Sequence, residues 1–301
     1  MTVHQDPWFH PAGSSTESGC DVSIRPGVTE GWSHTGLLVV TLAAGERHDQ
    51  PATECEWVIV PLEGRDWQVQ AGEESFALHG RESVWVGATD VAFVGRGVGF
   101  AVSTATGGRV ALAHAVAAQE RPAVLVPADE VPVETRGAGI ATREVRNFGT
   151  PAVLEADSII ACEVLTPAGN WSSYPPHKHD EDRPGVETRL EEIYYFQVRP
   201  EAGAPGEADP IAYQRVFGDD DRPIDVLHEV RTDDVVLVPH GWHGPSMAPP
   251  GYDLYYLNVM AGPGAERAWL IQDHPAHAWV RSTWPAQPTD PRVPFSVGGG
   301  G

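Results

Sequence analysis

Two histidines separated by one residue are the most informative chemical feature of the sequence. His177 and His179 flank Lys178, the only lysine in the chain. Side chains alternate along a β-strand, so histidines at this spacing lie on one face and can bind one metal ion. Glu192 heads a strand-like apolar run, and His243 closes another. Three imidazoles and one carboxylate suit a divalent ion such as Zn²⁺, Mn²⁺, Fe²⁺ or Ni²⁺.

Two of these ligand assignments have rivals. Glu191 directly precedes Glu192, and His240 lies shortly before His243. An internal duplicate favours Glu192, because Glu56 directly precedes the corresponding apolar run in the first half. The spacing does not choose between His240 and His243. Four protein ligands leave open positions on a five- or six-coordinate ion, and a catalyst needs these for substrate oxygens.

The apolar segments that must position these residues are short, and most are β-branched or aromatic. Gly, Pro, Asp or Asn bounds most of them, in a chain with 32 glycines and 27 prolines. This pattern predicts an all-β protein of sandwich or barrel domains. One segment, 111–118, is compatible with either a helix or a strand.

The chain repeats one plan. In the first half, His48 and then Glu56 precede the segment 89–97, and the second half has its histidine pair, Glu192 and the segment 233–241 in the same order. Similarities in one order at similar spacing predict a duplicated β domain. The first copy has a single histidine where the second has two, so we expect the metal site in the second copy only.

The repeat and the distribution of turn residues predict the domain organisation. We expect an N-terminal domain with a degenerate metal site at residues 1–138 and a metal-binding domain at 139–282. The tail at 283–301 has four prolines and a terminal glycine run, which predicts an extended or disordered segment.

Composition excludes several function classes. A net charge of −22 argues against nucleic acid or an anionic membrane as a partner. The N-terminus lacks the apolar region of a signal peptide, and no apolar run is long enough to span a membrane. Three scattered cysteines without C-x-x-C spacing predict reduced thiols in a cytoplasmic protein. The sequence leaves open whether the protein forms a homo-oligomer.

The pattern His-x-His, Glu and Pro-x-Gly-x-His resembles the two cupin motifs, and the doubled plan resembles a bicupin. Longer motifs are similar to those of bacterial 5-deoxy-glucuronate isomerases, a resemblance that extends from about Val28 to Trp279. It implies two tandem cupin domains, with the metal in the second. The motifs that carry it are Gly169–Asp180, Glu187–Tyr195 and Gly251–Gly262. The ligand positions that it implies are His177, His179, Glu192 and His243.

The resemblance also implies an activity in myo-inositol breakdown. The family converts 5-deoxy-D-glucuronate to 5-dehydro-2-deoxy-D-gluconate, an aldose–ketose isomerisation of a sugar acid. The chain departs from the family pattern at Trp242-His243-Gly244, where Tyr-His-Pro is usual, and by an insertion at 204–210. The alternatives are a cupin dioxygenase using Fe²⁺, a 4-deoxy-uronate isomerase and a non-enzymatic sugar-binding bicupin.

An isomerase of this kind needs groups that move a proton between adjacent carbons and between their oxygens. The candidates are Tyr194, Tyr252, Tyr256 and Asp180, beside Tyr255, His240 and a metal-bound hydroxide. Strand alternation places Tyr252 and Tyr256 on one face and Tyr255 on the other, so only one set can face the interior of a barrel.

The carboxylate of the substrate needs a cation. Arg215 and Arg189 are the candidates, since a guanidinium binds a carboxylate through two parallel hydrogen bonds. Lys178 is a third, but strand alternation directs it away from the metal. We expect it to bind the neighbouring acidic stretch 180–182 instead.

Overall fold

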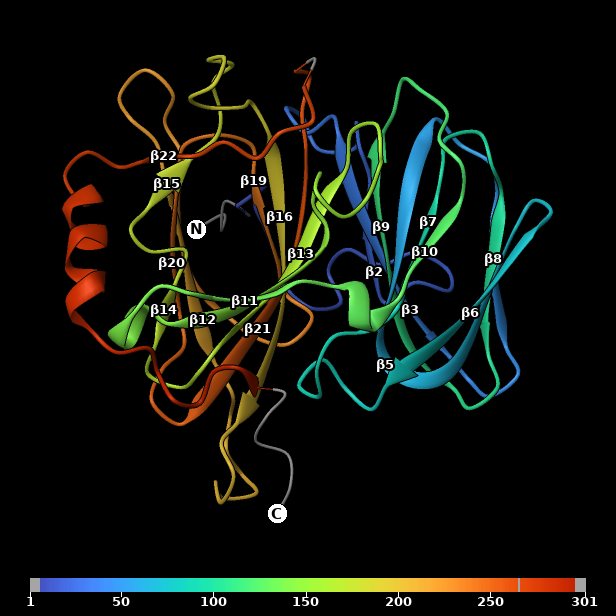
Figure 1. The fold of residues 1–301 in the computed structure, drawn as a ribbon, viewed down its shortest axis with the longest axis horizontal. Coiled ribbons are helices and arrows are strands. Elements are labelled where there is room, and N and C mark those ends of the chain that lie inside the picture. The colour runs from blue at the N-terminus through green and yellow to red at the C-terminus, as the bar shows by residue number, and fades with distance from the viewer. Residues whose placement is uncertain (1–5, 265, 296–301) are drawn as a thin grey trace, which may run out of the picture.

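The computed structural model describes residues 6–264 and 266–295, and it consists of antiparallel β-sheets in two units that lie side by side (Figure 1). The predicted all-β fold is confirmed. The segment 111–118 lies mostly in a strand. No helix among the described residues is long and apolar enough to cross a membrane.

The first unit is a nine-stranded sheet that folds on itself. Its longest strand, β5, pairs with β7 and β9 through its first half and with β6 and β8 through its second. It therefore runs through both layers of the folded sheet. The strands are β2 (Val22–Ile24), β3 (Thr35–Leu42), β4 (Arg47–Gln50), β5 (Cys55–Ala71), β6 (Glu74–Arg81), β7 (Val91–Val94), β8 (Phe100–Thr104), β9 (Gly108–Val116) and β10 (Val124–Val126).

The second unit consists of a seven-stranded and a six-stranded sheet. The larger has the order β1 (Phe9–His10), β19 (Val235–Val238), β16 (Glu191–Pro200), β21 (Tyr252–Ala261), β13 (Ile160–Thr166), β12 (Arg143–Gly149) and β11 (Val133–Arg136). The smaller contains β18 (Asp225–Val230), β17 (Ala212–Phe217), β20 (Trp242–Met247), β15 (His177–Lys178), β22 (Gln272–Asp273) and β14 (Trp171–Ser172). Three short 3-10 helices complete the fold: η1 (Ala128–Glu130), η2 (Gly139–Ala141) and η3 (Ala278–Ala286).

Strand alternation divides the apolar side chains among three cores. In β16, Tyr194 and Phe196 pack inside the second unit. Ile193 and Tyr195 face the opposite way and join side chains of the first unit in a core shared by both units. A third core fills the interior of the first unit. Strands with apolar side chains on both faces therefore form the sheets in the middle of the molecule.

A short edge strand completes a sheet in each unit. β1, at the start of the chain, pairs with β19 of the second unit, and β10, at the end of the first repeat, pairs with β7. The backbone N–H of Ala12 donates to Asp234 at 2.8 Å, and that of Ala128 donates to Asp90 at 2.8 Å. In both halves, an edge strand is thus followed by a backbone N–H that binds the corresponding aspartate, which supports the predicted duplication.

The pairings place the change of unit earlier than residue 138. β10 belongs to the first unit, whereas β11 already lies in the seven-stranded sheet of the second. The N-terminal strand β1 also lies in the second unit, so residues 1–138 are not one continuous unit.

The tail differs from the expectation of an extended or disordered segment. Residues 283–286 complete η3, and hydrogen bonds hold the residues that follow on the second unit. Pro288 accepts from the Gly139 N–H at 2.8 Å, and the Phe295 N–H donates to Glu144 at 2.6 Å. Residues 296–301 lie outside the described part of the chain.

Candidate metal centre

Three buried imidazoles from two adjacent strands converge inside the second unit. His177 on β15 is directly opposite His243 on β20, and His179 follows β15. One ligand nitrogen from each lies within 4.8 Å of the others. Glu192, at the start of β16, completes the group. One of its oxygens is 3.1 Å from the Nε2 atoms of both His179 and His243.

Backbone carbonyls orient all three imidazole rings. The Nδ1 atom of His177 is 3.4 Å from Pro175 O, that of His179 is 3.1 Å from Leu190 O, and that of His243 is 3.3 Å from Gly241 O. A carbonyl oxygen only accepts, so each Nδ1 carries the proton and each Nε2 presents a lone pair.

These Nε2 lone pairs face one another and the Glu192 oxygen. Lone pairs at this distance repel unless a cation lies between them, and Nε2 of His243 has no hydrogen-bond partner among the described residues. The donor set therefore fits a divalent ion of the borderline class, for which imidazole and carboxylate are the usual ligands.

The protonation states also fit a cation site. Burial and the neighbouring imidazoles of His243 and His179 hold the pKa of His177 well below its usual value, so the ring is neutral. Burial would raise the pKa of Glu192, but its close contacts with the His179 and His243 rings outweigh burial and lower the pKa to about 2. The neutral ring of His177 and the carboxylate of Glu192 are the forms that bind a metal ion.

The geometry chooses between the rival ligands. Glu191 faces the other side of β16, where it accepts hydrogen bonds from the backbone N–H groups of Ser33 and Thr35 in the first unit. His240 does not belong to the histidine cluster. Glu192 and His243 are the residues that face the centre.

The duplicate that favoured Glu192 was aligned one residue out of register. Glu56 accepts hydrogen bonds from the backbone N–H groups of Asp157 and Ile159, which is the role of Glu191 in the second half. Trp57 therefore corresponds to Glu192, and it stacks on His114 with ring centroids 4.1 Å apart. The first copy has filled its centre with an aromatic pair.

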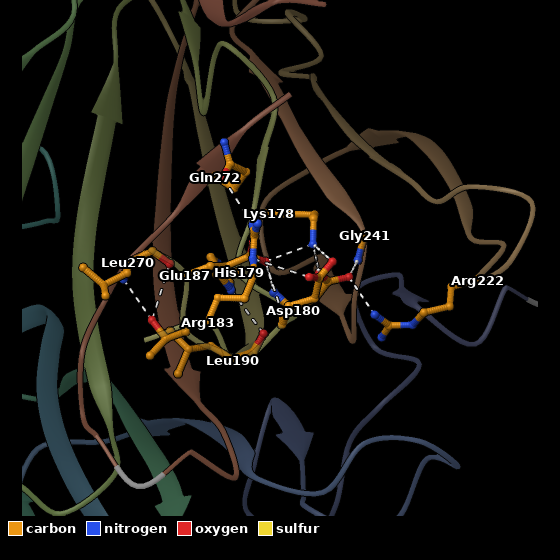
Figure 2. Close-up of polar contacts among 12 residues, drawn as sticks. Lys178, His179, Asp180, Arg183, Glu187, Leu190, Arg222, Gly241, Leu270 and Gln272 are labelled. Atoms are coloured by element: carbon orange, nitrogen blue, oxygen red, sulfur yellow. Dashed lines mark hydrogen bonds and ion pairs between the residues drawn. The ribbon is translucent and has the colours of Figure 1, made fainter. Parts of the chain in front are cut away.

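Lys178 points away from the histidines, as strand alternation predicted, and joins a network of carboxylates (Figure 2). Its Nζ is 2.6 Å from Asp180, 2.5 Å from Glu181 and 3.0 Å from Glu187. Asp180 also accepts from the Gly241 N–H at 2.8 Å. The network thus connects the strand of His177 and His179 to the turn that precedes His243.

A cavity of about 570 Å³ opens beside the centre. His177 and Glu192 line it, together with Tyr194 and Tyr256. The hydroxyl of Ser173 lies 3.1 Å from the Tyr194 hydroxyl and 3.2 Å from that of Tyr256. The cavity size is typical of a site for a small molecule.

Burial keeps both tyrosines protonated. Burial and the nearby charge of Glu192 raise the pKa of Tyr194 well above its usual value. Burial raises the pKa of Tyr256 to about 12, although hydrogen bonds from Ser172 and Ser173 oppose it. At neutral pH the two hydroxyls are therefore hydrogen-bond donors rather than bases.

The structure does not bring the remaining predicted site residues to the cavity. Asp180 is bound in the Lys178 network, and Tyr252 lies at the far end of β21, opposite Pro200. Arg215 pairs with Asp225 on β17–β18, and Arg189 lies in a separate surface groove. Local alternation fixes which face of a strand a residue occupies, but not which end of the barrel holds the site.

Sequence analysis missed the cations that do line the cavity, Arg136, Arg143 and Arg281. It also missed Ser173, although this residue lies inside the motif 169–180. Ser173 has a φ of 48°, a left-handed conformation that is uncommon for a residue other than glycine. No local pattern in the sequence marks Arg143, because β12 reaches the cavity only through its place in the sheet.

Comparisons with known proteins find relatives along most of this chain. The model of the KduI/IolB family matches residues 8–280. The chain belongs to the KduI/IolB family. A relative named 5-deoxy-glucuronate isomerase from Geobacillus kaustophilus is 40% identical over 279 residues, which cover 90% of this chain and 94% of the relative. A relative of the same name from Listeria innocua is 38% identical, with 85% of this chain and 94% of the relative covered.

Solved structures also match this KduI/IolB family member over most of its length. An IolB-like protein from Salmonella typhimurium LT2 has a TM-score of 0.80 and 36% identity, with 91% of this chain and 98% of that chain covered. Oxalate decarboxylase from Lactobacillus farciminis has a TM-score of 0.62 at 12% identity, with 91% and 89% covered. The second likeness concerns the fold alone, and it agrees with the predicted bicupin architecture.

Proposed function

We propose that this protein is a metal-dependent 5-deoxy-glucuronate isomerase that forms 5-dehydro-2-deoxy-D-gluconate in myo-inositol catabolism. The observation that carries the proposal is the convergence of His177, His179, Glu192 and His243 beside a cavity with protonated tyrosines. The family and the names of its relatives support the same activity.

The residues of the centre would hold one divalent ion of the Zn, Mn, Fe or Ni class. When bound, such an ion polarises a carbonyl oxygen and stabilises negative charge that develops on neighbouring oxygens. Tyr194 is buried, and low exposure to solvent strengthens electrostatic interactions of this kind.

The hydroxyls of the cavity supply protons. Tyr194 and Tyr256 both contact Ser173, so a proton that leaves one hydroxyl can be replaced through the others. Donation from Tyr194 to a substrate oxygen suits the part of an isomerisation in which charge moves from one oxygen to the next. Asp180 and Tyr252 are not part of this proposal because they lie outside the cavity.

The test is an anaerobic assay of the purified protein with 5-deoxy-glucuronate, followed by NMR, together with analysis of its metal content. We expect isomerisation without oxygen or a redox cofactor, loss of turnover on chelation and recovery when a divalent ion is returned. His177→Ala should lose both metal and turnover, whereas His79→Ala, at an exposed position of the first unit, should keep both.

Four results would contradict the proposal. Full turnover by metal-free His177→Ala would separate the centre from the reaction. Oxygen uptake with an aromatic or thiol substrate would indicate a dioxygenase. Faster turnover of a 4-deoxy-uronate would indicate the other isomerase activity, and bound sugar acid without turnover would indicate a binding protein.

A further inference from the structure

Three arginines line the cavity beside the candidate metal centre, and two of them are neutralised by their own carboxylates. Both oxygens of Glu134 accept from Arg136, at 3.2 and 2.7 Å. Asp273 binds Arg281 in the same two-point manner, with one contact at 2.7 Å. These two guanidiniums are already occupied.

Arg143 has no such partner. Its side chain is 5% exposed, and no carboxylate among the described residues lies within ion-pair distance of it. The hydrogen bond that its guanidinium makes within the described chain is from Nη1 to Ala141 O, at 3.0 Å. The guanidinium lies 5.7 Å from the ring centroid of Trp284 on η3.

Other buried arginines of this protein show what an arginine in a purely structural role looks like. Arg146, on the opposite face of the same strand, is 2.7 Å from Glu144. Arg81 binds Glu163 with two nitrogens. A buried charge without a partner costs free energy, so its retention in Arg143 indicates a ligand that supplies the missing anion.

The position of Arg143 suits the far end of a sugar acid. In β12, Arg143 and Val145 line the cavity, while Glu144 and Arg146 face away from it. The Tyr194 ring is 6.2 Å from the His243 ring, and the Tyr256 ring is 5.0 Å from Tyr194. Arg143 and Tyr256 line the same cavity, and the charge of Arg143 opposes the rise in the pKa of the Tyr256 hydroxyl.

We propose that Arg143 binds the carboxylate of the sugar-acid substrate and so directs its aldehyde end toward His177, Glu192 and His243. This inference rests on the proposed isomerase function and assigns the residue that distinguishes a sugar acid from a neutral sugar. A guanidinium suits the role because it binds a carboxylate through two parallel hydrogen bonds.

The test compares two substrates that differ only at the carboxylate: 5-deoxy-glucuronate and neutral 5-deoxy-glucose. In Arg143→Gln, we expect kcat/KM for the acid to fall roughly 100-fold, mainly through KM, while kcat/KM for the neutral sugar changes less than about threefold. Arg143→Lys keeps the charge but not the planar fork, and should lose about tenfold for the acid alone. Arg65→Gln, at the surface of the first unit, is the matched control.

The two substrates separate binding from folding. Equal losses for the acid and the neutral sugar, or no loss for the acid, would overturn the assignment. If Arg143→Gln does not fold by circular dichroism, Arg143→Lys decides by the same ratio. Calorimetric binding of the acid to the metal-loaded protein gives an independent measurement, so absence of turnover in the unmodified protein would refute the isomerase function while binding still tests Arg143.

Discussion

At the scale of single residues, backbone carbonyl oxygens hold the three histidine rings of the centre in place. A carbonyl oxygen receives the Nδ1 proton of each histidine, which fixes the ring and its tautomer before any ion binds. Lys178 supports the same arrangement from the other face of the strand. It is surrounded by carboxylates and lies 5.6 Å from the ring centroid of Trp242, the residue before His243.

Replacing Lys178 with Met tests this supporting role. We expect the free energy of unfolding to fall by about 1.5–3 kcal/mol, because the buried Asp180 and Glu187 would each lose one of their two cationic partners. Metal affinity should fall by roughly tenfold or more, as the strand of ligands loosens. Urea unfolding and a competitive chelator titration measure the two effects.

Arg47→Met, which removes an exposed pair with Asp49, is the control and should change neither quantity measurably. A Lys178→Met protein with unchanged stability and metal affinity but little turnover would show that Lys178 takes part in the reaction itself.

At the scale of elements, buried glutamate side chains on the strands of one unit bind the backbone of the other unit. Glu56 on β5 binds the backbone just before β13, and Glu191 on β16 binds the backbone at the start of β3. A buried ion pair between Arg81 on β6 and Glu163 on β13 adds a second kind of contact. Tyr255 on β21 donates to the same carboxylate at 2.7 Å.

The ion pair predicts how stability depends on pH. Burial alone would raise the pKa of Glu163, but the charges of Arg81 and Arg146 lower it below its usual value. A carboxylate with a lowered pKa in the folded state stabilises the protein above the pKa of the unfolded chain, near 4.3, and this stability is lost as the pH falls through the folded pKa.

We expect Glu163→Gln to lower the free energy of unfolding at pH 7 by about 3–5 kcal/mol and to reduce its further loss as the pH falls below roughly 4.3, the pKa of the unfolded chain. Urea titrations at a series of pH values measure both. Glu82→Gln removes an exposed pair with Arg65, and its free energy of unfolding should depend on pH as that of the unmodified protein does. An unchanged acid slope in Glu163→Gln would assign the pH dependence to other groups.

At the scale of the whole molecule, the two units share one apolar core. Side chains from β3, β5 and β9 pack in the same cluster as those from β13, β16 and β21. The N-terminal strand β1 crosses to the second unit, where Leu237 donates its N–H to Trp8 O at 2.8 Å. Neither unit is therefore covered without the other.

This shared core predicts the behaviour of fragments. Residues 139–282 expressed alone would expose the apolar outer faces of three central strands, so we expect aggregation or dye binding typical of exposed apolar surface. Co-expression of 1–131 with 132–301 should restore one soluble complex. Size-exclusion chromatography and thermal unfolding measure the outcome, and a monomeric fragment as stable as the whole chain would refute the prediction.

Sequence alone was sufficient for the parts of the site that depend on local spacing. His177 and His179 lie on one face because alternation is a property of the strand itself. The same rule directed Lys178 away from the metal and put Tyr194 on the face of Glu192, but it left open whether Tyr256 or Tyr255 faces the interior. The motifs around these residues also indicated the family and the ligand positions.

Only the tertiary structure decided what depends on packing between distant strands. Glu191, rather than Glu192, proved to be the counterpart of Glu56, because register between strands is set by their partners and not by the run of apolar residues. Arg215 and Arg189 have the right chemistry to bind a carboxylate, but neither of them lines the cavity. Arg143 reaches the cavity because β12 pairs with β13, which in turn pairs with β21. These pairings join segments that are distant in the sequence, so spacing along the chain does not reveal them.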